Sequence, residues 1–82
     1  MSILLRILSP EKLLLEKEVA KVELPGAKGR FVVLRGHAPI ITALNEGEIA
    51  WAVKADGPWE KLTTGPGFAE VCDDKVNACV ER

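Results

Sequence analysis

Acid–base chemistry could start at two places in this sequence, the single histidine His37 and the adjacent carboxylates Asp73 and Asp74. His37 lies in a Gly36-His37-Ala38-Pro39 corner, where a side chain most often supports the turn, and the sequence places no acid or hydroxyl beside it. Adjacent residues at a hairpin tip point apart into solvent, so Asp73-Asp74 is predicted to form a turn. No catalytic residue is predicted. A small enzyme built around His37 is the weaker alternative, and His37→Ala would abolish activity only in that case.

Cys72 and Cys79 are the candidates for redox chemistry or metal binding. If Asp73-Asp74 is the centre of a hairpin, Cys72 pairs with Lys75 and Cys79 with Phe68. The thiols then share a face but lie about 13 Å apart, at roughly 3.3 Å per residue, which is beyond disulfide reach. Two cysteines and one distant histidine also fall short of a zinc set. We therefore expect free thiols in a reducing compartment and no metal.

Nucleotide binding has weak candidates. The glycine-rich segment 26–36 carries no Gly-Lys-Ser/Thr and leads into a strand rather than a helix, and Gly65-Pro66-Gly67 fails the same test. Trp51 and Trp59 could stack on a nucleobase or sugar, yet with so few aromatic residues at least one is expected in the core. No cofactor and no bound nucleotide are predicted.

Length and composition bound the function further. The chain has 82 residues, 48% of them hydrophobic, which is enough for one small domain over residues 1–82 and no second one. The net charge of −1, with both signs interspersed, argues against a nucleic-acid partner. The apolar opening, residues 2–9, is short and interrupted by Arg6, so it predicts no membrane-spanning segment, and the chain should stay in the cytosol.

The elements that would position these residues are short strands. Alternating apolar and polar residues, bounded by turn residues, indicate strands over 3–8, 13–15, 19–24, 31–34, 40–44, 48–55 and 59–64, followed by a last hairpin that ends with 75–80. About nine such strands predict an all-β fold, an antiparallel two-sheet β-sandwich or flattened barrel.

Three details of the strands can be tested. In segment 19–24, Ala20, Val22 and Leu24 should face the core. Asp56-Gly57 should turn a hairpin between 48–55 and 59–64, although Pro58 makes its register uncertain. The last hairpin should bury five residues, Ala69, Val71, Val76, Ala78 and Val80. Phe68 should then point outward, where an exposed aromatic residue suits a partner contact.

Two separated motifs carry a family resemblance. Leu24-Pro25-Gly26, a glycine-bounded loop, the strand Phe31-Val32-Val33-Leu34 and the Gly-His-Ala-Pro corner run into Ile40-Ile41-Thr42-Ala43-Leu44, and Thr64-Gly65-Pro66-Gly67-Phe68-Ala69-Glu70-Val71 follows later. In this order and spacing they resemble the epsilon subunit of F-type ATP synthases.

The resemblance implies a two-sheet β-sandwich in a noncatalytic subunit of the rotor, or central stalk. Such a subunit binds the gamma subunit and the c-ring and couples ion translocation to ATP synthesis, as a peripheral protein at the cytoplasmic face of the cell membrane. The family's C-terminal helical hairpin, which holds its nucleotide site, would begin where this chain ends. The chain is then either a naturally short epsilon subunit or an excised domain, and its start at Met1 without a tag favours the short form.

The resemblance also implies interface positions. Ser9 and His37 match family positions near the gamma and c-ring contacts, and Lys28, Gly29 and Arg30 lie in the loop that abuts the c-ring. Arg30 stands where relatives often carry an acidic residue, Val32 where glycine is common, and Arg35 where proline is common. No carboxylate lies between Leu24 and Leu34, so Lys28 and Arg30 are expected to present unneutralised positive charge. The predicted partner interface consists of Ser9, Lys28, Gly29, Arg30, His37 and Phe68.

The main alternative belongs to another class. A free-standing β-sandwich could use its exposed aromatic residues to bind a small ligand or a peptide. Copurification separates the two hypotheses, because a rotor subunit should bring gamma and c-ring partners with it.

Overall fold

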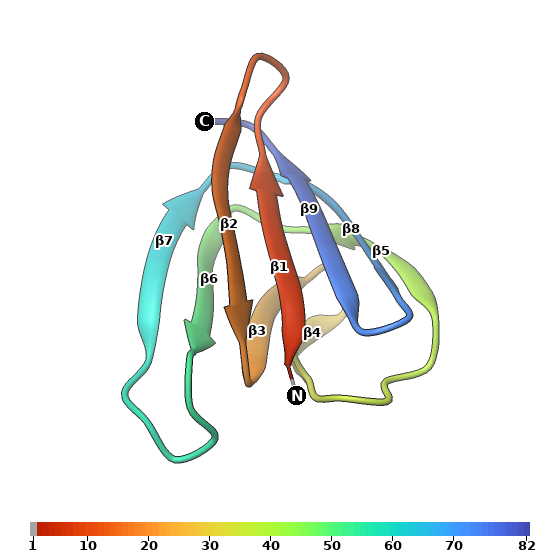
Figure 1. Cartoon of the computed structure of the whole chain (residues 1–82). Helices are drawn as coiled ribbons and strands as arrows, with labels where there is room; N and C mark the ends of the chain where they lie inside the picture. Colours follow the sequence, from red (N-terminus) through yellow and green to blue (C-terminus); the bar gives the residue numbers. More distant parts are fainter. Residues whose placement is uncertain (1) are drawn as a thin grey trace.

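The computed structural model describes residues 2–82 and contains nine strands, which curl into a half-open barrel (Figure 1). They are β1 (Ile3–Leu8), β2 (Leu13–Val19), β3 (Lys21–Gly26), β4 (Gly29–Val33), β5 (Ile40–Leu44), β6 (Gly47–Ala52), β7 (Glu60–Thr64), β8 (Gly67–Cys72) and β9 (Lys75–Val80). Within residues 2–82 there is no helix of the length and hydropathy needed to cross a membrane.

The strands follow the order β2-β1-β9-β8-β5-β3-β6-β7, and β4 pairs with β3. β5 and β3 meet at one residue pair, Gly26 with Leu44. The sheet bends at this junction, so β2-β1-β9-β8-β5 forms one layer and β4-β3-β6-β7 the other. The all-β expectation is confirmed.

One strand pair departs from the predicted antiparallel arrangement. β1 lies between β2 and β9, antiparallel to β2 and parallel to β9, with Leu5 opposite Val76. A parallel pair needs a long connection, which here is the whole chain between the first and the last strand. Short-range turn signals predict hairpins only, so they could not indicate this pair.

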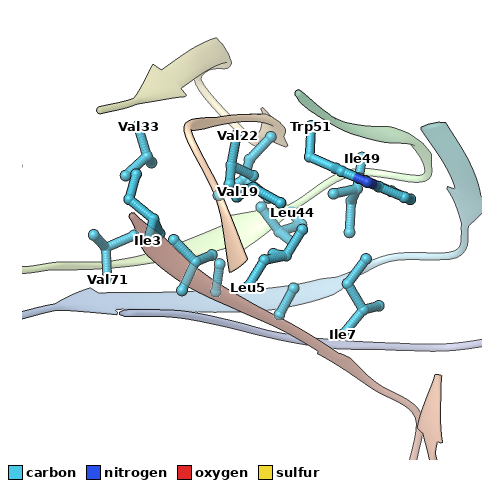
Figure 2. Close-up of a cluster of buried hydrophobic side chains, with 14 of the residues drawn as sticks. Ile3, Leu5, Ile7, Val19, Val22, Val33, Leu44, Ile49, Trp51 and Val71 are labelled. Carbon is cyan, nitrogen blue, oxygen red and sulfur yellow. The ribbon is translucent and has the colours of Figure 1, made fainter. Parts of the chain in front are cut away.

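The core lies between the two layers. Figure 2 shows side chains of β1 directed toward those of β3 and β6. The fully buried large side chains come from both layers: Ile3, Leu5, Ile7, Leu24, Ile49, Val19, Val22, Val33, Val71 and Val76. Trp51 is buried, which confirms that at least one tryptophan belongs to the core, whereas Trp59 is 41% exposed. Two buried polar atoms, Trp51 Nε1 and Thr64 Oγ1, have no hydrogen-bond partner within residues 2–82.

The predicted strand 19–24 is wrong in its boundary and in one of its three core residues. Val19 ends β2, a bend follows at Ala20, and β3 begins at Lys21. Val19 and Val22 are both buried, whereas Ala20 is only half-buried and donates its N–H to the Ala52 carbonyl at 2.8 Å. The bend shifts the inward positions by one residue, which a strict period of two cannot represent.

The hairpin between β6 and β7 exists, but its turn is longer than Asp56-Gly57 alone. Trp51 pairs with Glu60, and the connection between the two strands runs from Val53 to Trp59. Pro58 cannot donate a ladder hydrogen bond and restricts the residue before it, which prevents a two-residue turn at this place. The Gly57 N–H instead donates to the Lys54 carbonyl at 3.0 Å.

The last hairpin has the predicted register. Cys72 pairs with Lys75 and Phe68 with Cys79. Asp73 and Asp74 both have positive φ, 52° and 58°, as a two-residue type I′ turn requires. The five predicted core residues are buried, and Phe68 is 55% exposed. Both cysteines are free and exposed.

Candidate functional site

His37 supports its own corner. Its backbone N–H donates to the Leu34 carbonyl at 3.2 Å, and its ring Nδ1 lies 2.7 Å from the Ala38 carbonyl. A carbonyl only accepts, so this contact assigns the proton to Nδ1. The ring lies 6.3 Å from that of Phe31, centroid to centroid. Within the described chain no carboxylate or hydroxyl is hydrogen-bonded to His37, and the bonds that it does make are those that hold the turn.

Asp74 corrects the expectation that both turn carboxylates are simply solvated. Its Oδ1 accepts the N–H of Gly36 at 2.7 Å, and its Oδ2 lies 3.7 Å from Arg35 Nε. Its backbone carbonyl accepts the N–H of Leu4 at 3.0 Å. Asp74 therefore connects the β8–β9 turn to the corner before β5 and to the start of β1. These contacts link residues far apart in sequence, so no local pattern could indicate them.

Arg30 corrects the expectation of unneutralised positive charge. Its Nε lies 3.3 Å from Glu23 Oε2, and its Nη2 donates to the Glu48 carbonyl at 2.8 Å. Arg30 is a strand residue of β4, opposite Pro25 of β3. Glu23 lies just outside the segment that the sequence argument considered, and the tight register of β3 with β4 brings it within reach.

Lys28 lies in the β3–β4 turn, and Gly29 follows it as the first residue of β4. Lys28 is exposed and makes no ion pair within residues 2–82. Gly29 has a φ of 131°, which side-chain-bearing residues rarely adopt, and space around its α-carbon is open. Of the two predicted cations, Lys28 is the one available to a partner.

Ser9 and Phe68 lie in the same open hollow. Ser9 also holds the β1–β2 turn, because its Oγ donates to the Lys12 carbonyl at 3.2 Å and accepts the Lys12 N–H at 3.3 Å. The hollow measures about 510 Å³ and is lined by Leu8, Ser9, Pro10, Pro66, Gly67, Phe68, Cys79, Val80 and Glu81. Sequence reasoning missed Leu8 as its neighbour, since the β1–β9 pairing that brings Leu8 beside Cys79 was not foreseen.

The turns and connections between strands lie at two ends of the molecule (Figure 1), and the candidate residues fall at both. Phe68 pairs with Ala43, whose carbonyl accepts the N–H of Ala27 in the β3–β4 turn at 2.9 Å. Lys28 therefore shares one end with the Ser9 hollow, and we call this the Ser9 end. The corner with His37 lies with the β8–β9 turn at the opposite end, which we call the Asp74 end.

A polar cluster on the outer face of β3, β6 and β7 was not predicted. Lys61 Nζ lies 3.7 Å from Glu48 Oε1, and Lys21 Nζ lies 4.6 Å from the ring centroid of Trp59. With the Arg30–Glu23 pair, positive and negative groups alternate over this face. Charges are compensated locally, which does not favour an anionic ligand. No group of at least three metal-ligating side chains occurs within residues 2–82.

The Cys72 thiol lies beside the carboxylate of the next residue, Asp73. The neighbouring Asp73 carboxylate raises the pKa of the Cys72 thiol, because a nearby negative charge disfavours the thiolate. A raised pKa makes a thiol less reactive, which argues against a nucleophilic role.

Comparison with known proteins decides the family. Residues 2–82 match the family model described as ATP synthase, Delta/Epsilon chain, beta-sandwich domain. The chain belongs to this family. Both motifs that carried the resemblance fall within the match, so the recognition from sequence is confirmed.

The Delta/Epsilon family match is accompanied by similar curated proteins. An ATP synthase epsilon chain of Synechococcus sp. (strain JA-2-3B'a(2-13)) is 35% identical over 82 residues, which are 100% of this chain and 58% of that protein. One from Desulfitobacterium hafniense (strain DSM 10664 / DCB-2) is 43% identical over 72 residues, 88% of this chain and 53% of that protein. The chain thus spans a little over half the length of these relatives.

Solved structures show the same fold. A chain in the Euglena gracilis mitochondrial ATP synthase, described as OSCP/F1/c-ring in rotational state 1, superposes with a TM-score of 0.88 at 23% identity, over 99% of this chain and 51% of that one. A chain in the central stalk/c-ring of Tetrahymena thermophila mitochondrial ATP synthase gives a TM-score of 0.79 at 11% identity, over 100% of this chain and 65% of that one.

Proposed function

We propose that this β-sandwich is a noncatalytic part of the rotor of an F-type ATP synthase. It docks on the gamma subunit and on the c-ring and couples ion translocation to ATP synthesis. The observation that carries the proposal is the family match over residues 2–82, together with relatives named as ATP synthase epsilon chains. The ligand-binding alternative has no comparable support.

The two-ended arrangement suits a subunit with two partners. Lys28, exposed at the Ser9 end, is the candidate for pairing with polar or acidic groups on the loops of the c-ring. The His37 corner at the Asp74 end is then available to the gamma subunit. A stiff double layer between the two contact regions can pass on a displacement without absorbing it.

The domain is proposed to work without chemistry of its own and without bound nucleotide. Its place is the cytoplasmic face of the cell membrane, where the complex holds it as a peripheral protein. His37 serves its corner, and the exposed face around Trp59 has neutralised cations, so neither supplies a nucleophile or a phosphate site.

The decisive experiment is reconstitution of the chain into an F-type ATP synthase depleted of its epsilon subunit. Retention in the complex and ATP-driven ion pumping in proteoliposomes are measured for the unmodified chain and for Lys28→Glu. The unmodified chain should be retained and support pumping. Lys28→Glu should weaken docking by about 2 kcal/mol, the lower end of what losing one partner of a desolvated charge pair costs.

Lys54→Glu is the matched control. It makes the same charge change in the exposed β6–β7 loop, which Figure 1 shows on the other side of the molecule from the β4–β5 connection that carries His37, and Lys54 is also outside any ion pair within residues 2–82. Arg30 is unsuitable as the probe, because its reversal also breaks contacts to Glu23 and Glu48 inside the domain. Equal retention and pumping for Lys28→Glu and Lys54→Glu would refute the Lys28 contact. An unmodified chain that neither stays bound nor supports pumping would refute the function.

A further inference from the structure

The segment from Leu34 to Pro39 has no strand to hold it. It connects β4 to β5 in an irregular path, and Leu34 is 56% exposed. Gly36 has a φ of 78°, a conformation that residues with a side chain rarely adopt. Inside the segment, the hydrogen bonds are those of His37 to the Leu34 and Ala38 carbonyls.

The fixed point of this corner comes from another part of the chain. Asp74 Oδ1 accepts the Gly36 N–H at 2.7 Å, and Asp74 Oδ2 lies 3.7 Å from Arg35 Nε. One carboxylate thus holds two consecutive residues, one through its backbone and one through its side chain. The bond from Gly36 is charge-assisted, and bonds of this kind are shorter and stronger than neutral ones, whereas the contact with Arg35 is an ion pair.

Asp74 is itself well anchored. Its carbonyl accepts the Leu4 N–H at 3.0 Å, at the start of β1, which has a paired strand on each side. The carboxylate is therefore presented from the rigid part of the fold. Its side chain is 35% exposed, so solvent competes only in part for the bond.

Turn chemistry gives an independent reason to single out Asp74. Its φ of 58° lies in the left-handed region, which glycine and asparagine adopt more readily in a type I′ turn. Asp73 has nearly the same conformation, with a φ of 52°, but within residues 2–82 it has no hydrogen bond or ion pair to the corner. The turn alone does not require a carboxylate at position 74, whereas the corner uses one.

We propose that Asp74 is a positioning residue that fixes the corner from Leu34 to Pro39 and presents His37 in an ordered conformation to a partner protein. The presentation of His37 to a partner rests on the proposed function, with the gamma subunit as that partner. That Asp74 fixes the corner concerns the chain alone. Ordering the corner before docking removes an entropic cost that the complex would otherwise carry.

The test uses Asp74→Gly with Asp73→Gly as its matched control. Both substitutions relieve a positive φ in the same turn, so their effects on thermal stability should differ only by the contribution of the Asp74 contacts to the corner. Only Asp74→Gly removes the acceptor for Gly36. Amide hydrogen exchange at Gly36, followed by NMR, should accelerate about five-fold in Asp74→Gly, the factor for one ordinary hydrogen bond, and stay unchanged in Asp73→Gly.

Asp74→Asn completes the series. Asparagine keeps one acceptor oxygen and tolerates the left-handed conformation, so protection at Gly36 should be largely retained while the attraction to Arg35 is lost. Unchanged Gly36 exchange in Asp74→Gly would overturn the proposal. Faster exchange that extends through β1 and β9 instead of staying at the corner would overturn it as well, because Asp74 would then be a general structural residue.

Docking is measured with the epsilon-depleted ATP synthase as the probe. Asp74→Gly should be retained less well than Asp73→Gly and the unmodified chain. Loss of Gly36 protection with full retention would overturn the role toward the partner. If the proposed function itself is wrong, the unmodified chain will not be retained either. In that case Gly36 exchange still decides whether Asp74 fixes the corner.

Discussion

At the scale of single residues, polar side chains in this domain connect strands more than they present charge. Arg30 of β4 contacts Glu23 of β3 and the Glu48 carbonyl of β6, so one guanidinium spans three strands. The Arg30 side chain is 42% exposed, and each such pair stabilises the fold by only about 0.5 kcal/mol. Its effect is to orient neighbouring strands and to leave Lys28 as the available cation of the turn.

The titration of Cys72 can be tested at the same scale. Because the Asp73 carboxylate raises the pKa of the Cys72 thiol, Asp73→Asn should lower that pKa. The thiolate then forms at lower pH, and the midpoint of the pH–rate profile for alkylation by iodoacetamide should move to lower pH. The measurement uses a Cys79→Ser background, so that Cys72 alone reacts.

Asp56→Asn, in the β6–β7 loop, is the control for that experiment. It removes the same charge at a site that is not among the causes of the Cys72 shift. A midpoint that moves equally in both variants would mean that net charge, rather than the neighbouring Asp73, governs the thiol.

Residue contacts were predictable only where a turn defined them. The pairing of Cys72 with Lys75 followed from a two-residue turn at Asp73-Asp74, and the structure has it. The contact of Asp74 with Gly36 joins residues 38 positions apart, and no periodicity carries such information. For the same reason the sequence could not indicate that the candidate interface residues lie at two ends of the domain.

At the scale of elements, the position of a strand in the sheet determines how well its backbone is protected. β9 has neighbours on both sides, β1 and β8. β2 and β7 are the two ends of the strand order, and we call the gap between these two strands the seam. An exposed ion pair crosses it, with Lys17 Nζ of β2 3.6 Å from Glu60 Oε1 of β7. An exposed pair of this kind does not replace a ladder of backbone hydrogen bonds.

Hydrogen exchange should therefore follow the sheet order. Amides of β9 should exchange slowest, near the rate set by global unfolding, whereas those of β2 and β7 that face the seam should exchange at least about ten-fold faster through local opening. Amide exchange followed by NMR measures both sets in one experiment. Equal protection of β2, β7 and β9 would indicate that the seam is closed by pairing in solution.

Elements with a clean alternation were predicted well, and elements with a bend were not. The last hairpin alternates throughout, so its buried residues were identified from period alone. The bend at Ala20 and the long β6–β7 connection depend on how the two layers meet, which is decided by packing after the strands have formed.

At the scale of the whole molecule, both layers share one core. The buried cluster draws on β1, β8 and β9 from one layer and on β3, β4 and β6 from the other. Neither layer can keep its apolar face covered when the other unfolds. The domain should therefore behave as one cooperative unit with limited stability, about 5 kcal/mol for a chain of this size.

Urea denaturation tests this unity. Fluorescence of Trp51 and Trp59 reports on the β6–β7 layer, and far-ultraviolet circular dichroism reports on all strands, with a spectrum of strand and almost no helix expected. The two transitions should coincide, as two-state unfolding requires. Separate midpoints would show that the layers unfold independently, and substantial helix would contradict the fold.

The parallel pairing of β1 with β9 has a consequence for the order of events during biosynthesis. The second strand of the pair is the last strand of the chain, so β1 cannot acquire its neighbour until residues 75–80 have left the ribosome. Contacts between such distant segments slow folding, because a long loop must close first. At roughly 5–20 residues per second of synthesis, the emerging chain spends several seconds with one edge of β1 open. During that interval this apolar edge can pair with another nascent chain, and it is the place where a chaperone would act.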